Sequence, residues 1–165
     1  MEDNIYKAPQ ADLKTPQADD NFLASRWSRL AAAIIDGFIY MPIMLPLMYF
    51  TGGFDGVTEG AQPSLLYTFI MGLISAAVFL LIQGYFLLNN SQTIGKKVLG
   101  LRIVTMDGEP AQTVPLAKRY GFYLGIALIP VVGSYISFVG ILFIFGKAKR
   151  CIHDYIGGTQ VIKIQ

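Results

Sequence analysis

Three long runs that lack charge constrain this chain more than any other feature. Residues 30–50 carry one charged side chain, Asp36, and residues 64–88 and 120–145 carry none. About 20 helical residues cross a hydrocarbon core of about 30 Å, so each run is long enough to span a membrane. Backbone groups in lipid must be paired within their own segment, which makes these runs helices. We therefore predict an integral membrane protein.

The composition excludes several other classes of protein. Only 15% of the residues are charged, against about 25% in soluble domains, and the net charge of +2 is too small for a nucleic-acid partner. One Cys and one His exclude a disulfide framework and a zinc site built from these residues alone. Neither a nucleophile–base set nor a metal-ligand cluster is evident in the sequence. We expect no enzyme, no cofactor and no metal.

The chain begins with a polar tail, residues 1–21, which is rich in Pro, Gln, Asp and Ala. The tetrapeptide Pro-Gln-Ala-Asp occurs in it twice, at residues 9–12 and 16–19. Bulky apolar residues are nearly absent, so the tail cannot offset the entropy lost on ordering. We predict that residues 1–21 are disordered and that residues 22–165 form one transmembrane domain.

Positive charge sets the expected orientation. The Lys and Arg residues are distributed as four in residues 1–29, none in 51–63, five in 89–119 and four in 146–165. Cytoplasmic segments carry an excess of these residues. Both termini and the central loop are therefore predicted to be cytoplasmic.

The third apolar run must accommodate this orientation. Three straight spans would place the C-terminal Lys and Arg residues outside the cell, against the charge rule. Residues 129–134 (IPVVGS) form a natural helix break. We favour two short helices that enter and return, the first beginning near Val114, as a helical hairpin or re-entrant segment. A third straight span is the alternative.

Two short segments outside the apolar runs have the pattern of strands. Residues 99–105 are followed by an Asp107-Gly108 turn, and residues 159–164 alternate after a Gly pair. A lone strand pair is only marginally stable, so we expect these two segments to pair beside the helices, on one side of the membrane. The predicted fold is an all-α membrane bundle of two full spans and a broken third segment, with a small cytoplasmic β element.

Three ordered motifs resemble the RDD family, bacterial membrane proteins named for one arginine and two aspartates. The motifs are RLAAAIID at 29–36, QTIGKKVLGLRIV at 92–104 and RCIHDYIGGTQVI at 150–162. The matching residues are Arg29, Asp36 and Asp154, and the resemblance covers about residues 22–163. It implies a multi-pass protein of the bacterial inner membrane. It implies no settled activity: transport of unknown ligands is suggested for the family, and cation/proton exchange for some members.

Asp36 is the ionisable residue deepest in a predicted span. It lies seven residues after Arg29, which places both on one helix face. Such a group faces a bundle interior or a water-filled cavity. Gln83 is level with Asp36 if the first two helices are antiparallel, so we expect Asp36 to lie beside Gln83. Two roles are open: a proton or cation relay, or a hydrogen-bonded cluster that fixes how the helices pack.

The C-terminal motif offers a second pair. Asp154 is expected to approach Arg29 at the inner boundary, which would close the C-terminal segment onto the first helix. His153 has no evident cluster around it and is expected to have a surface or packing role, and Cys151 is expected to be a reduced structural thiol. Thr93–Lys97 resembles a phosphate-binding loop only superficially, because Asn90 stands where that loop requires its first glycine.

Two functions follow from these features. The first is a small transporter or cation/proton exchanger of unknown ligand that uses Asp36. We expect it to form a homo-oligomer, because the few helices of one chain are not enough to line a pore well. The alternative is a non-catalytic membrane scaffold or assembly partner whose Arg and Asp residues are structural. Polar residues on the predicted helices are few: Asp36, Gln83, Ser75 and Ser137. The expected surroundings are the lipid bilayer and an unknown ligand or protein partner.

Overall fold

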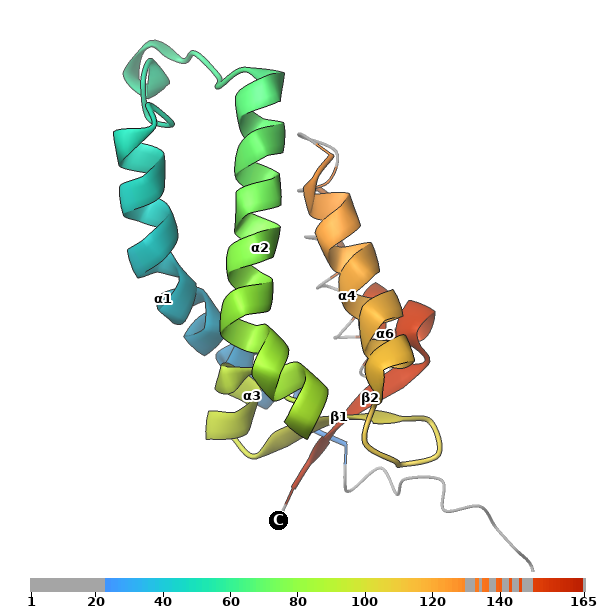
Figure 1. Cartoon of the computed structure of the whole chain (residues 1–165). Coiled ribbons are helices and arrows are strands. Elements are labelled where there is room, and N and C mark those ends of the chain that lie inside the picture. The colour runs from blue at the N-terminus through green and yellow to red at the C-terminus, as the bar shows by residue number, and fades with distance from the viewer. Residues whose placement is uncertain are drawn as a thin grey trace, which may run out of the picture.

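Two long antiparallel helices dominate the architecture. The computed structural model describes residues 23–129 and 150–164, and between them residues 133, 135, 136, 139, 140, 143 and 146. Helix α1 (Arg26–Phe50) and helix α2 (Leu65–Asn90) stand side by side and are joined at one end by a loop that contains η1 (Val57–Glu59) (Figure 1). Serine caps start both helices, since Ser25 Oγ accepts from Ser28 N–H and Ser64 Oγ accepts from Tyr67 N–H.

The surface of α1 and α2 suits a lipid environment. Only 6% of the most apolar window of each helix is buried inside the protein. Large apolar side chains such as Phe50, Leu65 and Leu81 are more than 70% exposed. Exposed apolar patches of this extent mark a surface that meets a partner or a membrane. The two predicted spans are therefore present as long helices with an apolar exterior.

The predicted strand pair is present at the other end of the long helices. Strands β1 (Leu101–Thr105) and β2 (Thr159–Lys163) pair antiparallel, with Ile103 opposite Val161. Ala24, just before α1, donates its N–H to the carbonyl oxygen of Val161 at 2.9 Å. The start of the first span, the central segment and the C-terminus thus meet at one end of the molecule (Figure 1). The core there combines buried side chains of the sheet with residues of the long helices such as Ala32 and Leu87. Which side of the membrane this end faces is still a prediction.

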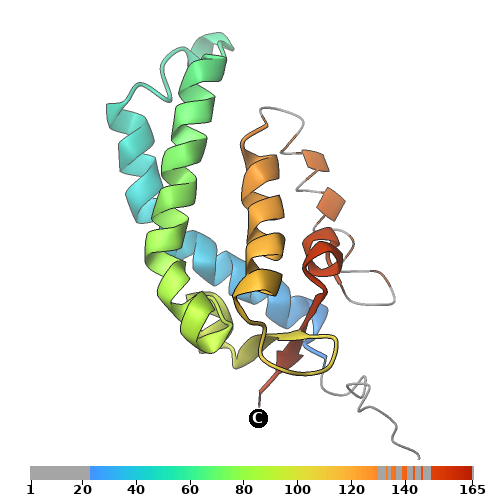
Figure 2. The ribbon, with the colours of Figure 1, turned by 45° about the vertical axis from the view of Figure 1, so that its right-hand side comes forward.

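Three further helices surround this end. Helix α3 (Ile94–Val98) follows α2, helix α4 (Thr113–Ala127) rises beside α2, and helix α6 (Ile152–Gly157) lies against α4 (Figure 2). Helix α4 begins near Val114 and ends before the expected break, as predicted. Because α6 and β2 lie back at the base of α4, the chain returns there between Ala127 and Ile152. The predicted hairpin stays a prediction, because its returning half lies largely outside the described residues, as does the tail 1–21.

Candidate functional site

Asp36 lies where α1 meets α2 and α3. Its Oδ1 accepts hydrogen bonds from Gln83 Nε2 at 2.9 Å and from Gly95 N–H at 2.7 Å. Its Oδ2 accepts from Thr93 Oγ1 at 2.6 Å. The Gln83 amide also accepts from Ile94 N–H at 2.8 Å through Oε1. The Asp36 cluster (Asp36, Gln83, Thr93 and Gly95) therefore joins three helices, and both carboxylate oxygens are hydrogen-bonded.

The start of α3 is shaped to receive this carboxylate. Thr93 caps the helix, and the first N–H groups of a helix have no partner within it. A carboxylate is also favoured there by the helix dipole. Gly95 allows the close approach, because a Cβ at this position would lie 2.2 Å from the carbonyl oxygen of Ala32 in α1. The absence of a side chain at Gly95 is what lets the backbone of α3 reach Asp36.

Gly95→Ala is expected to destabilise the protein by about 1–3 kcal/mol, because the added methyl group must push α3 away from α1. Gly121→Ala in α4 is the matched control, since a Cβ at Gly121 meets no described atom within 4 Å. The measurement is thermal unfolding of the purified protein in detergent. Equal melting temperatures for the two variants would show that the α1–α3 contact is not close.

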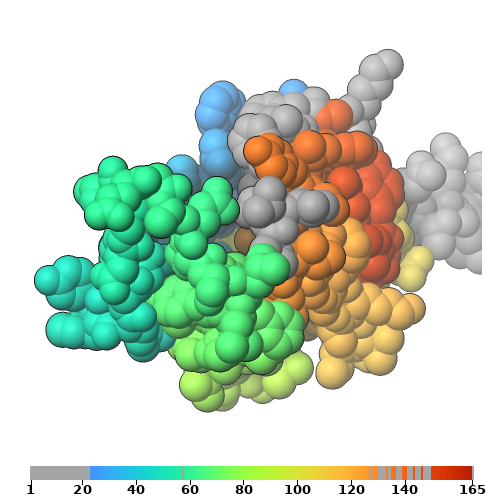
Figure 3. Space-filling view, turned by 90° about the horizontal axis from the view of Figure 1, so that it is seen from above, coloured from blue at the N-terminus to red at the C-terminus, as the bar shows by residue number. Residues whose placement is uncertain are grey.

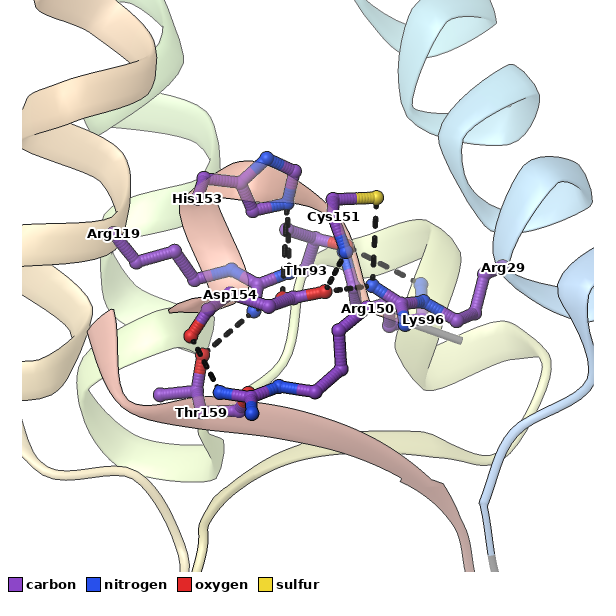
Figure 4. Close-up of polar contacts among 9 residues, drawn as sticks. All are labelled: Arg29, Thr93, Lys96, Arg119, Arg150, Cys151, His153, Asp154 and Thr159. Carbon is purple, nitrogen blue, oxygen red and sulfur yellow. Dashed lines mark hydrogen bonds and ion pairs between the residues drawn. The ribbon is translucent and has the colours of Figure 1, made fainter. Parts of the chain in front are cut away.

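Asp154 lies in α6 and is fully buried. Its two oxygens form ion pairs with Arg29 of α1 and Arg119 of α4, and Oδ2 also accepts from Cys151 N–H at 2.8 Å. Arg119 donates further to Thr159 Oγ1 of β2 at 2.9 Å. Figure 4 shows the two guanidinium groups approaching the carboxylate from opposite sides. The Asp154 cluster (Arg29, Arg119, Cys151, His153 and Asp154) thus joins α1, α4, α6 and, through Thr159, β2.

The charges in this cluster determine its protonation. Burial raises the pKa of Asp154, but the guanidinium groups of Arg119 and Arg29 together lower it by more than burial raises it. The pKa of Asp154 therefore lies well below its usual range. Burial raises the pKa of the Cys151 thiol, which keeps it protonated at neutral pH. Asp154 is therefore a permanent anion between two permanent cations.

The cluster also contains three atoms that can ligate a metal, on Cys151, His153 and Asp154, all within 4.8 Å of one another. Each already faces a guanidinium donor: Arg29 Nη2 lies 3.8 Å from Cys151 Sγ, and Arg119 Nη2 lies 3.2 Å from His153 Nε2. A divalent ion would be repelled by both arginines and would meet a protonated thiol. The donor set does not fit a metal. The prediction that His153 has no cluster around it is wrong: the start of α6 brings Cys151 and Asp154 together beside it, and α4 adds Arg119.

His153 is expected to make stability fall in mild acid. Burial, followed by the charge of Arg119, lowers the pKa of His153 to about 3, whereas the unfolded value is about 6.5. Between these values the unfolded chain binds a proton that the folded protein does not, so the free energy of unfolding falls as the pH falls. From pH 7 to pH 5 the loss is about 2 kcal/mol.

The chain offers a direct control, since His153 is its single histidine. His153→Gln should remove most of the difference in unfolding free energy between pH 7 and pH 5. The measurement is denaturant unfolding in detergent at both pH values. A variant with the same pH dependence as the wild type would assign the effect to other groups.

A central cavity of about 400 Å³ lies between the two clusters. It is bounded by α1 and α2 on one side and by α4 and α6 on the other. The view from above in Figure 3 shows α1 and α2 on one side of the molecule and α4 on the other. Arg29, Arg119 and Lys96 line it, and Asp36 is the carboxylate among its described lining residues. If the nearby Asp154 is counted with Asp36, the site contains three cationic side chains and two carboxylates.

Lys96 differs from the two arginines. Its ammonium lies 3.4 Å from Thr93 Oγ1, and within the part of the chain that the structure describes no carboxylate oxygen lies within 4.0 Å of it. Burial, and next the charge of Arg119, lower the pKa of Lys96 to about 8. The ammonium therefore still carries its charge at neutral pH.

The structure brings together both residue pairs that the sequence predicts. Asp36 is hydrogen-bonded to Gln83, and Arg29 is paired with Asp154. Ser75 lines the cavity, where its hydroxyl and carbonyl oxygens lie against the Tyr40 hydroxyl. Ser137 lies outside the described residues.

Sequence reasoning missed Arg119, Thr93 and Gly95. The sequence does contain a signal for Arg119, because a cation at the start of an apolar helix needs a partner. Thr93 and Gly95 carried none beyond the resemblance to a phosphate loop, since the contact depends on where α3 meets α1. Arg150 is also engaged: its guanidinium donates to the carbonyl oxygens of Thr159 and Asp154 and thereby braces α6 against β2.

The long apolar helices, together with the buried Arg–Asp contacts that join α1 and α4 to α6, define a helical membrane protein. The profile of the RDD family matches residues 23–158. The chain belongs to the RDD family.

Relatives support this assignment. The chain is 30% identical to "Uncharacterized membrane protein YteJ" of Bacillus subtilis, in an alignment that covers 98% of this chain and 92% of the relative. It is 29% identical to an uncharacterized protein of Haemophilus influenzae, with 85% and 78% covered, and 29% identical to "Uncharacterized protein YckC" of Bacillus subtilis, with 84% and 83% covered. No solved structure matches the chain significantly.

Proposed function

We propose that this protein is a small-solute transporter whose central cavity is the solute site. The cavity itself supports the proposal: about 400 Å³ lies among α1, α2 and α4, where a purely structural bundle would be filled with side chains. The surface of its lining is mainly apolar, but many of the lining residues also present polar or charged groups, among them Ser75, Gln83 and Lys96. This combination is typical of small-molecule sites.

Cation/proton exchange through Asp36 fits the geometry less well. Both oxygens of Asp36 are already hydrogen-bonded to α2 and α3, so a cation would have to displace these donors. The lining cations Arg29, Lys96 and Arg119 would also repel it. We therefore place the solute in the cavity and assign Asp36 a structural role.

A membrane scaffold is the second candidate. It is favoured because Asp154 and Asp36 are both engaged in contacts between structural elements, as expected of residues whose role is to hold the fold together. A scaffold would not require the cavity. A test must therefore address the cavity without touching either cluster.

Two glycines supply that test. Gly37 in α1 lines the cavity, and Gly84 in α2 is not among its lining residues; a Cβ at either position meets no described atom within 4 Å. Gly37→Leu should fill the cavity, and Gly84→Leu should add the same side chain elsewhere. Uptake into proteoliposomes is measured with rubidium ions, phenylphosphonate and glycerol as cationic, anionic and neutral probes.

The transporter proposal expects uptake of at least one probe above that of protein-free liposomes. Gly37→Leu should lower this uptake about tenfold, and Gly84→Leu should leave it within about twofold, because only the first closes the path. Uptake of none of the probes, or equal effects of the two leucines, would overturn the proposal and favour the scaffold.

A further inference from the structure

The central cavity contains more hydrogen-bond donors than acceptors. Within the described part of the chain, Arg119 Nε and the Tyr120 hydroxyl are buried and hydrogen-bonded to no third group, although the Arg119 guanidinium itself lies against Tyr120, 5.7 Å from its ring centroid. The Lys96 ammonium, with three N–H donors, has only the 3.4 Å contact to Thr93 Oγ1. All of these residues line the cavity. Buried donors are almost always satisfied in proteins, so a partner with several acceptor atoms is expected.

The carboxylates near these donors are already engaged. Asp36 receives three hydrogen bonds, and Asp154 receives two guanidinium groups. A bound cation would therefore find no open carboxylate among the described residues that line the cavity, whereas an anion would find Lys96 and the unpaired edge of Arg119. Charge-assisted hydrogen bonds to an acid group are about twice as strong as neutral ones.

The apolar part of the lining lies further along the helices than the charged part. Phe79 precedes Gln83 by one turn of α2, and Leu124 follows Arg119 by five residues of α4, which corresponds to about 6–8 Å along each helix. Both lie toward the apolar middle of the long helices and away from α3. The cavity thus has a cationic end and, further along the helices, a less polar end, where the hydroxyl groups of Tyr40 and Ser75 lie against each other.

We propose that the central cavity binds an amphipathic organic anion, with its acid group at Lys96 and its apolar part against Phe79 and Leu124. This inference rests on the proposed function for the location of the solute and adds its chemical class. The shared chemistry is a phosphate, phosphonate or carboxylate group on an apolar body. A free solute and an anionic lipid headgroup both supply it.

The experiment measures binding rather than transport. The purified full-length protein is placed in phosphatidylcholine nanodiscs and titrated by calorimetry with phenylphosphonate, benzylamine and benzyl alcohol. These three probes carry the same ring with an anionic, a cationic and a neutral group. Phenylphosphonate should bind about tenfold more tightly than either of the others, because only it satisfies the donors.

Two neighbouring lysines give the matched variants. Lys96→Gln removes the charge that faces the cavity, and Lys97→Gln removes the same charge from an exposed side chain over the Phe86 ring. Lys96→Gln should weaken phenylphosphonate binding about tenfold and Lys97→Gln by less than about twofold. Lys96→Arg, which keeps the charge, should retain most of the affinity. Equal binding of the three probes, or equal losses in the two glutamine variants, would overturn the proposal.

Lipid composition then distinguishes the sources of the anion. If phosphatidylglycerol in the nanodiscs suppresses phenylphosphonate binding, the natural occupant is a lipid headgroup; if it does not, the occupant is a free solute. The outcome is separable from the transporter proposal. Rubidium or glycerol uptake that Gly37→Leu blocks, without phenylphosphonate binding, would leave transport standing and reject the anion. Selective binding of phenylphosphonate without uptake of any probe would support the anion site and reject the transporter proposal.

Discussion

Asp154→Asn is expected to lower the free energy of unfolding by about 3–5 kcal/mol, because removing one member of a buried ion pair leaves the other charge unpaired. Two guanidinium groups lose their partner at once: the Arg29 and Arg119 residues are 7% and 3% exposed. Asparagine keeps the size of the side chain and one acceptor oxygen. The loss therefore reports the charge rather than the packing. Denaturant unfolding in detergent measures it.

Asp107→Asn makes the same chemical change in an exposed turn and should alter the stability by less than about 0.5 kcal/mol. The pairing itself is tested by a double-mutant cycle of Arg29→Ala and Asp154→Ala. Residues that share a buried ion pair are not additive. The double variant should be more stable than the sum of the single losses implies, and strictly additive losses would reject a direct interaction.

The long helices were predictable because hydropathy and length act locally. The runs at 30–50 and 64–88 carry the signal themselves: α1 starts four residues before the first run and ends with it, and α2 is shifted from the second run by one residue at its start and two at its end. The contact between Asp36 and Gln83 was also predictable, since two antiparallel helices of known length bring polar groups of equal depth together. The strand pair followed from a pattern of alternation, supported by the need of each strand for a partner.

The short helices were not predictable from local sequence. Helix α3 has five residues and α6 has six, too few to be stable alone, so their conformation depends on contacts with other elements. In α3 these contacts are the bonds from its first residues to Asp36 and Gln83. The conformation of α3 therefore depends on the position of α1, which the sequence of α3 alone does not specify.

The second partner of Asp154, Arg119, could not be predicted for the same reason. Arg119 is 35 residues from Asp154 in the chain and reaches it only because α6 folds back onto α4. Gly157 permits this packing, since a Cβ there would lie 3.0 Å from the Cβ of Arg119. The contact with Asp154, rather than the charge of the residue, distinguishes Arg119 from Lys118 beside it. The cavity likewise depends on how far apart α1, α2 and α4 are held, which no single segment encodes.

Asp36→Ala is expected to lower the free energy of unfolding by at least about 3 kcal/mol, because it leaves Gln83, Thr93 and the Gly95 N–H without their acceptor at about 1–3 kcal/mol each. Asp36→Asn keeps one acceptor oxygen and should cost about half as much. Unfolding and proteoliposome uptake are measured on the same preparations. If Asp36 is structural, the folded fraction of Asp36→Asn should take up the transported probe at the wild-type rate. Uptake that is lost while the stability is unchanged would instead identify Asp36 as a proton or cation relay, because only a relay requires the carboxylate to change its protonation state.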